Sequence, residues 1–177
     1  MYRPVASTRV NARRLSLAVG ALAAVAGCRD ITSPTQDPTT VAYAPSLGIK
    51  LSEYTKDTSG VYYLDVAVGS GNKAVPNSTL TYYYTGYLAD GRQFDARQPP
   101  SSAVSSVIGA GQNIRGFDRG LLGVTGSSRR RLIIPPALGY GNKSQGTAIP
   151  AGSVLIFEVD VTAVTLPATT TTSKAPR

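Results

Sequence analysis

The sequence predicts a domain of the α+β class that combines an antiparallel β-sheet with one short helix. Between residues 46 and 166, apolar and polar residues alternate in several stretches, as in strands with one buried face. Turn residues such as Asp90-Gly91 separate these stretches. Apolar residues at helical spacing occur clearly only in residues 113–124, so we expect a single helix.

The expected strands follow from this alternation and from the turn residues between them. In residues 79–88, Leu80, Tyr82 and Tyr84 share one face. In chain order, the expected strands are 51–56, 61–69, 79–88, a strand returning from Asp90-Gly91 through Asp95, 103–108, 128–134 and 153–164.

The expected helix has an apolar stripe formed by Ile114, Phe117, Leu121 and Val124. Glycines interrupt the stretch and lower its intrinsic helix propensity. We therefore expect a short helix that depends on packing against the sheet. A loop over residues 137–152 follows the strand at 128–134.

The N-terminal residues 1–27 have the features of a secretory signal peptide. Arginines precede an apolar stretch at 15–27, which is too short to span a bilayer as a mature helix. The stretch Val25-Ala26-Gly27-Cys28 resembles the lipobox of bacterial lipoproteins, which predicts lipidation of Cys28. An ordinary signal peptide with a chance cysteine is the alternative, and Arg13-Arg14 leaves a twin-arginine signal open.

Lipidation would place the protein in the cell envelope, anchored to a bacterial membrane by acyl chains. Residues 28–45 are rich in Thr, Pro and polar residues, which predicts a flexible tether after the lipidated cysteine. The folded domain is expected over residues 46–166, and a disordered tail over 167–177.

Composition excludes several kinds of chemistry. The chain has no histidine and one cysteine, so it lacks histidine-based nucleophile arrangements, His-ligated metal sites and internal disulfides. We expect no metal and no cofactor. The net charge is +8, but much of it lies in the N-terminal arginines and in the run 129–131. A basic run on a strand usually forms a solvated face, so we expect no nucleic-acid partner.

Several short motifs occur in a fixed order within the expected domain. They are YTGYLADGRQFD at 84–95, IG at 108–109, IRGF at 114–117, RRLIIPP at 130–136, LGYG at 138–141, IP at 149–150 and LIFEV at 155–159. Together they resemble the FKBP-type peptidyl-prolyl cis-trans isomerases, the macrolide-binding immunophilins. The resemblance implies a curved antiparallel sheet, or half-barrel, wrapped around one short helix, with an aromatic pocket between them.

The resemblance also implies site residues. Catalytic roles would fall to Tyr84, Asp95 and Tyr140. Substrate-binding roles would fall to Phe94, Val104, Ile114, Phe117, Ile149 and Phe157, with Ile114 offering its backbone N–H. The family usually has tryptophan where this chain has Phe117, and often phenylalanine where it has Val104. These smaller residues predict a roomier or shallower pocket.

Each residue also has a simpler interpretation. The phenylalanines alone would suit plain core packing, Tyr84 could be a core hydroxyl, and Asp95 could bond its own backbone in a turn. Tyr140 lies between two glycines, which favours an accessible hydroxyl.

The sequence thus predicts a peptidyl-prolyl cis-trans isomerase that assists the folding of envelope proteins. Its expected partners are proline-containing polypeptides, macrolide ligands such as tacrolimus, and a membrane through the lipid on Cys28. A desolvated pocket can accelerate rotation about the X-Pro amide without a nucleophile. The alternative is a proline-peptide-binding or chaperone module with little turnover, which Phe117 and Val104 favour.

Overall fold

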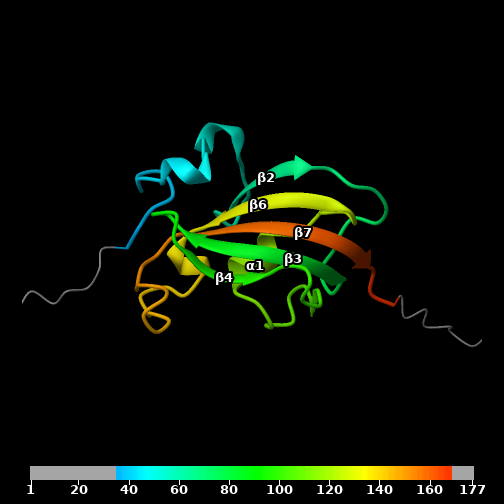
Figure 1. Cartoon of the computed structure of the whole chain (residues 1–177). Helices are drawn as coiled ribbons and strands as arrows, with labels where there is room; N and C mark the ends of the chain where they lie inside the picture. Colours follow the sequence, from blue (N-terminus) through cyan, green and yellow to red (C-terminus); the bar gives the residue numbers. More distant parts are fainter. Residues whose placement is uncertain (1–34, 169–177) are drawn as a thin grey trace, which may run out of the picture. The chain divides into compact units, whose positions relative to one another are not determined.

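The computed structural model describes residues 35–168 (Figure 1). The expected signal peptide, the lipidation site Cys28 and the tail beyond residue 168 lie outside the described residues. In the described part, a seven-stranded antiparallel sheet curves around one short helix, α1 (Arg115–Gly120) (Figure 1). The predicted fold class is therefore confirmed.

The sheet order is β1-β2-β6-β7-β3-β4, and β5 also pairs with β3. The strands are β1 (Thr55–Lys56), β2 (Tyr62–Ala67), β3 (Thr79–Leu88), β4 (Gln93–Arg97), β5 (Val104–Val107), β6 (Ser128–Ile134) and β7 (Leu155–Thr165). Within the described residues, the single turns of 3₁₀-helix are η1 (Pro45–Leu47), η2 (Leu51–Glu53) and η3 (Pro136–Leu138). None of the helices within residues 35–168 is long and apolar enough to cross a membrane.

The concave face of the sheet packs on α1. Two glycines allow the helix to approach β6 closely: a Cβ at Gly116 would lie 2.2 Å from Ile134, and one at Gly120 would lie 2.7 Å from Leu132. The glycines that lower helix propensity are thus required by packing. This core contains residues that the alternation placed inward, among them Leu80, Leu132, Ile134, Leu155, Phe157 and Val159.

Two predicted elements are less than two thirds as long as expected, while β2 and β5 are shorter only at their ends. The first strand was expected over 51–56, but only Thr55–Lys56 pairs. Leu51 and Tyr54 both pack on the second face of the sheet, the one that faces away from α1. The two residues are three positions apart, which is the repeat of the 3₁₀ turn that forms there. The helix was expected over 113–124 and has six residues, after which the chain turns with Leu121 and Val124 still buried.

The second face of the sheet has its own apolar cluster, which the N-terminal segment covers. The cluster includes Tyr62, Ile133 and Ile156, and Val41 and Tyr43 pack against it. The expectation of a flexible tether therefore fails for residues 36–45.

Backbone pairing holds this segment in place. The Gln36 N–H donates to the Gly152 carbonyl (2.8 Å), and the Ala44 N–H donates to the Ala89 carbonyl (2.8 Å). The Val154 N–H donates to the Gln36 side chain (2.8 Å). The segment is polar on average, but its few apolar residues pack on a face of the sheet that would otherwise be exposed to water.

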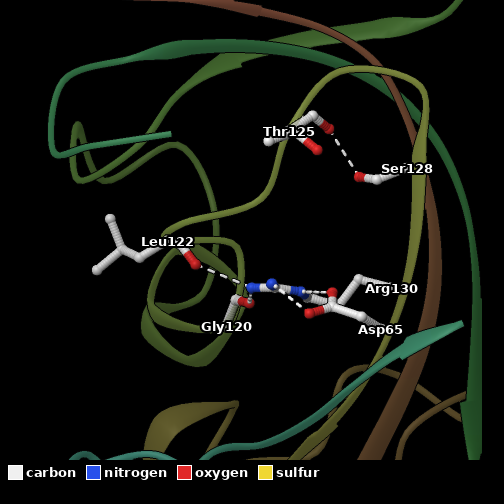
Figure 2. Close-up of polar contacts among 6 residues, drawn as sticks. All are labelled: Asp65, Gly120, Leu122, Thr125, Ser128 and Arg130. Atoms are coloured by element: carbon white, nitrogen blue, oxygen red, sulfur yellow. Dashed lines mark hydrogen bonds and ion pairs between the residues drawn. The ribbon is translucent and has the colours of Figure 1, made fainter. Parts of the chain in front are cut away.

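The basic run at 129–131 is not a uniformly solvated face, contrary to expectation. Arg130 is buried because it shares a face of β6 with Leu132 and Ile134. Its guanidinium bonds both carboxylate oxygens of Asp65 (2.6 and 3.0 Å) and donates to the carbonyls of Gly120 and Leu122 (3.0 and 2.8 Å) (Figure 2). These carbonyls lie where α1 ends, so Arg130 satisfies the acceptors that the helix leaves open.

The two neighbouring arginines also have acidic partners on β7. Arg129 pairs with Asp160 (2.5 Å), and Arg131 pairs with Glu158. The positive charge of the run is therefore matched by acids on adjacent strands of the sheet.

Candidate functional site

A cavity of about 520 Å³ opens between α1, the sheet and the loop that precedes the helix. Strands β3, β4 and β7 contribute one wall and α1 contributes Phe117. The cavity brings together all the predicted pocket residues except Ile149. They are Tyr84, Phe94, Asp95, Val104, Ile114, Phe117, Tyr140 and Phe157.

Aromatic rings form the base of the cavity. Phe117 and Phe157 meet edge to face with centroids 5.2 Å apart, and Phe94 meets Phe157 the same way at 5.5 Å. Phe117 and Phe157 are buried in the concave-face core and also line the cavity. From the sequence, core packing and pocket lining were alternative interpretations of these residues. In the structure the two phenylalanines do both.

Gly86 on β3 makes room for these rings. A Cβ at this position would lie 2.6 Å from the Phe94 ring and 3.1 Å from the Phe157 ring. The glycine of the YTG motif thus lets the Phe94 ring lie across the strand.

Tyr84 and Asp95 come together because β3 and β4 pair as a hairpin, with Gly86 opposite Asp95. The Tyr84 hydroxyl donates to Asp95 Oδ2 at 2.6 Å. Asp95 Oδ1 accepts from the Ala96 N–H at 2.8 Å, so the carboxylate bonds local backbone as well as Tyr84. Burial, with the adjacent Asp95 carboxylate, raises the pKa of Tyr84, and the phenol keeps its proton at neutral pH.

Ile114 presents an unused backbone donor. It caps the N-terminus of α1 in an extended conformation, and its carbonyl accepts from the N–H groups of Phe117 and Asp118. Its own N–H donates no hydrogen bond to any residue between 35 and 168. Since Ile114 also lines the cavity, this N–H can bind a carbonyl oxygen of a ligand.

Tyr140 enters the cavity from the loop after β6. The 3₁₀ turn η3 fixes this loop, and the Gly141 N–H donates back to the Pro136 carbonyl (2.8 Å). Tyr140 is partly exposed, and its hydroxyl has no hydrogen-bond partner within the described chain. It is therefore available to a ligand.

Ile149 does not line the cavity. It is 5% exposed and belongs to the concave-face core. Its backbone pairs with Gln145 in both directions (2.9 and 3.3 Å), and this small bridge closes the loop with the Ile149 side chain packed inside. The predicted contact of Ile149 with substrate is therefore not supported by its position.

Four lining residues were not predicted as site residues: Tyr82, Arg97, Gln112 and Asn113. Arg97 could have been found, because it lies two positions after Asp95 on a strand and so shares its face. The polar pair Gln112-Asn113 directly before Ile114 was a second signal. Tyr82 was expected in the core, and it is indeed 2% exposed, but its ring also forms part of the cavity wall.

No group of three or more His, Cys, Asp or Glu residues that could hold a metal ion occurs in residues 35–168. The cavity instead offers aromatic surface, one carboxylate, one guanidinium, hydroxyl groups and a free N–H. This combination suits the binding of an apolar ring flanked by carbonyl groups.

The family model for the FKBP-type peptidyl-prolyl cis-trans isomerases matches residues 70–162. Over 97 residues, the chain is 37% identical to an FK506-binding protein of Neisseria meningitidis, covering 55% of this chain and 89% of that protein. It is 40% identical to the human peptidyl-prolyl cis-trans isomerase FKBP2 over 89 residues, covering 50% of this chain and 63% of that protein. The chain belongs to the FKBP-type peptidyl-prolyl cis-trans isomerase family.

Solved structures agree with the fold. The crystal structure of AtFKBP13 is similar with a TM-score of 0.57 and 31% identity, covering 62% of this chain and 96% of that one. FkpA from Escherichia coli gives a TM-score of 0.58 at 26% identity, covering 68% of this chain and 55% of that one. The chain spans 43% of the FK506-binding protein 2B of Rhizopus delemar and 63% of human FKBP2.

Proposed function

We propose that the protein is a peptidyl-prolyl cis-trans isomerase that accelerates rotation about X-Pro bonds and so assists the folding of other proteins. The observation that carries this proposal is the cavity around Phe117. It combines an aromatic base, the Tyr84–Asp95 pair and the free Ile114 N–H in one site.

The chemistry follows from the amide. Resonance gives the X-Pro bond partial double-bond character, and uncatalysed isomerisation takes tens to hundreds of seconds. A proline ring held against Phe117 and Phe157 would leave water, which disfavours the planar, charge-separated amide relative to the twisted one. Hydrogen bonds from the Ile114 N–H and the Tyr140 hydroxyl would hold the flanking carbonyls, and each tenfold acceleration requires only about 1.4 kcal/mol of preference for the twisted form.

A protease-coupled assay with a proline tetrapeptide tests the activity, using a soluble form of the chain that starts after Cys28. We expect catalysed conversion of the cis peptide that rises in proportion to protein concentration. Phe117→Ala enlarges the cavity base and should lower kcat/KM by about tenfold or more. Phe94→Leu keeps an apolar side chain in the cavity base and should lower kcat/KM less.

A second candidate is a module that binds proline peptides with little turnover. Val104 supports it, because a valine encloses a bound ring less than a larger side chain does at the same edge of the cavity. The same peptide, followed by fluorescence binding, separates the two functions. Binding without turnover favours the module, and turnover favours the enzyme.

Macrolide ligands of the tacrolimus type are proposed as competitors for the same cavity. Support comes from the family and from the FK506-binding protein of Neisseria meningitidis that the chain resembles. The smaller rim at Val104 should weaken such a ligand, and a competition assay against the proline peptide measures this.

We also propose, from the sequence, that the protein is a lipoprotein and that it lies in the cell envelope. Residues 1–27 would be removed as a signal peptide and Cys28 would be acylated. The folded domain would then begin near Gln36, eight residues after the anchor, and the connection would reach about 28 Å at most. Metabolic labelling with a palmitate analogue, lost in Cys28→Ser, tests the acylation.

A further inference from the structure

Three polar side chains, two of which line the cavity, form a closed ring of hydrogen bonds. The Tyr82 hydroxyl lies 3.1 Å from Ser106 Oγ and donates to Asn113 Oδ1 at 3.3 Å. Asn113 Nδ2 donates to Ser106 Oγ at 3.0 Å. Tyr82 and Ser106 are 2% and 7% exposed, so the hydrogen bond between them is shielded from water.

The donors and acceptors of this ring can be assigned. The Asn113 amide nitrogen has two protons, and both are used, one toward Ser106 and one toward Asp118 Oδ1 at 2.9 Å. The one proton of the Tyr82 hydroxyl is donated to Asn113 Oδ1. The bond between Tyr82 and Ser106 must therefore use the proton of the Ser106 hydroxyl, with Tyr82 as acceptor. The Asn113 side chain therefore has no proton left for a ligand, although it lines the cavity.

The same network fixes the loop before α1 at both ends. Asp118 Oδ2 accepts from the Gly109 N–H at 2.9 Å, where the loop leaves β5. Asn113 is the last residue before Ile114, so its side chain restrains the peptide that carries the Ile114 N–H. That N–H has no partner in the described chain and belongs to a cavity residue.

We propose that Asn113 is a positioning residue, held by the ring with Tyr82 and Ser106, that aims the Ile114 N–H at the carbonyl of a bound proline peptide. The proposal rests on the proposed function only in the identity of that ligand. A donor fixed before binding loses little conformational freedom when the ligand arrives, so the ring should act mainly on affinity.

The test uses the soluble chain that starts after Cys28, since the seven strands of the described structure and both of its apolar clusters lie within residues 35–168. Ser106→Ala opens the ring with the smallest change, and Tyr82→Phe removes one hydroxyl. Matched controls are Ser105→Ala, an exposed serine next to Ser106 on β5, and Tyr83→Phe, next to Tyr82 on β3. NMR follows the Ile114 amide in the free protein, and a titration gives the Kd of the proline peptide.

We expect the NMR signal of the Ile114 amide to shift in both ring variants and in neither control, because the peptide that carries it is no longer restrained. The peptide Kd should rise about fivefold in each ring variant. The variant with both substitutions should bind the peptide no more weakly than either single variant, because either change opens the same ring.

An unchanged Ile114 amide and an unchanged Kd in folded Ser106→Ala and Tyr82→Phe would overturn the proposal, even if both variants melted at lower temperature. In that case the ring would only stabilise the loop. The amide measurement needs neither peptide nor turnover, so an absence of isomerase activity in the unmodified protein would refute the proposed function and leave this inference standing.

Discussion

The Tyr84 hydroxyl donates a 2.6 Å hydrogen bond to Asp95 Oδ2 from the neighbouring strand of the hairpin. The bond links the aromatic wall of the cavity to its one carboxylate. Tyr84→Phe removes the bond and keeps the ring, so it isolates the contribution of the hydroxyl.

We expect Tyr84→Phe to lower kcat/KM by about tenfold, because a hydrogen bond to a carboxylate contributes on the order of 1.5 kcal/mol. The protease-coupled assay measures this change. Tyr87→Phe on the opposite face of β3 is the matched control and should keep full activity. Equal rates for Tyr84→Phe and the unmodified protein would remove Tyr84 from the catalytic assignment.

Arg97 is the only cation among the residues that line the cavity, and no ion pair involves it within residues 35–168. It lies opposite Tyr84 in the β3–β4 pairing. We therefore expect peptides with glutamate before proline to be processed better than those with lysine. Arg97→Gln should reduce this ratio of kcat/KM by about fivefold at low salt, since about 1 kcal/mol of Coulomb energy is lost.

Arg92→Gln is the matched control for Arg97, because Arg92 lies in the turn of the same hairpin and outside the cavity. It should leave the ratio unchanged. Adding salt to about 0.5 M should shrink the effect of Arg97 by screening. A glutamate-to-lysine ratio that is the same in Arg97→Gln as in the unmodified protein would contradict this prediction.

The Arg130–Asp65 pair should contribute to the stability of the fold and not to isomerase activity. Arg130→Met leaves Asp65 and two carbonyls at the end of α1 without their donor. We expect a loss of about 2–3 kcal/mol in the free energy of unfolding, below the usual cost for a buried pair because Asp65 is partly exposed. Urea unfolding measures it.

Arg129→Met provides the comparison for Arg130, because the Arg129–Asp160 pair lies in a more exposed position on the same strands. It should cost at most about 1 kcal/mol. Equal losses for the two variants would mean that burial of Arg130 adds nothing to the stability of the fold.

The segment 36–45 should be part of the folding unit. A chain that starts at residue 46 loses the Gln36 and Ala44 backbone bonds and exposes the cluster around Ile133 and Ile156. We expect its melting temperature to fall by several degrees relative to a chain that starts at residue 35, since about 1 kcal/mol corresponds to about 4 °C in a domain of this size. Identical melting temperatures would restore the boundary predicted at residue 46.

The sequence alone predicted the elements whose signals are local. Period-2 alternation with clear turns placed Thr79–Leu88 and Ser128–Ile134 at their observed bounds. Apolar spacing found α1, although the helix ends at Gly120 and leaves the expected residues Leu121 and Val124 beyond it.

Other features depend on partners far along the chain, which alternation cannot show. Arg130 is buried with Asp65 as its ion-pair partner, 65 positions earlier in the chain. Residues 36–45 pack on a second face of the sheet that no local pattern reveals. Eight of the nine residues that the resemblance assigned to the site line the cavity. Ile149 does not, because its side chain packs in the concave-face core. Asn113 was missed because its hydrogen-bond partners lie on β3, β5 and α1.

The most direct test of the central claim is NMR exchange spectroscopy on a proline tetrapeptide with a catalytic amount of the soluble chain. It measures cis-trans interconversion at equilibrium and needs no protease. We predict exchange cross-peaks between the cis and trans proline signals at protein concentrations far below that of the peptide. These cross-peaks should weaken strongly in Phe117→Ala. Interconversion at the uncatalysed rate, with the peptide bound in the cavity, would contradict the assignment of this site as an isomerase centre.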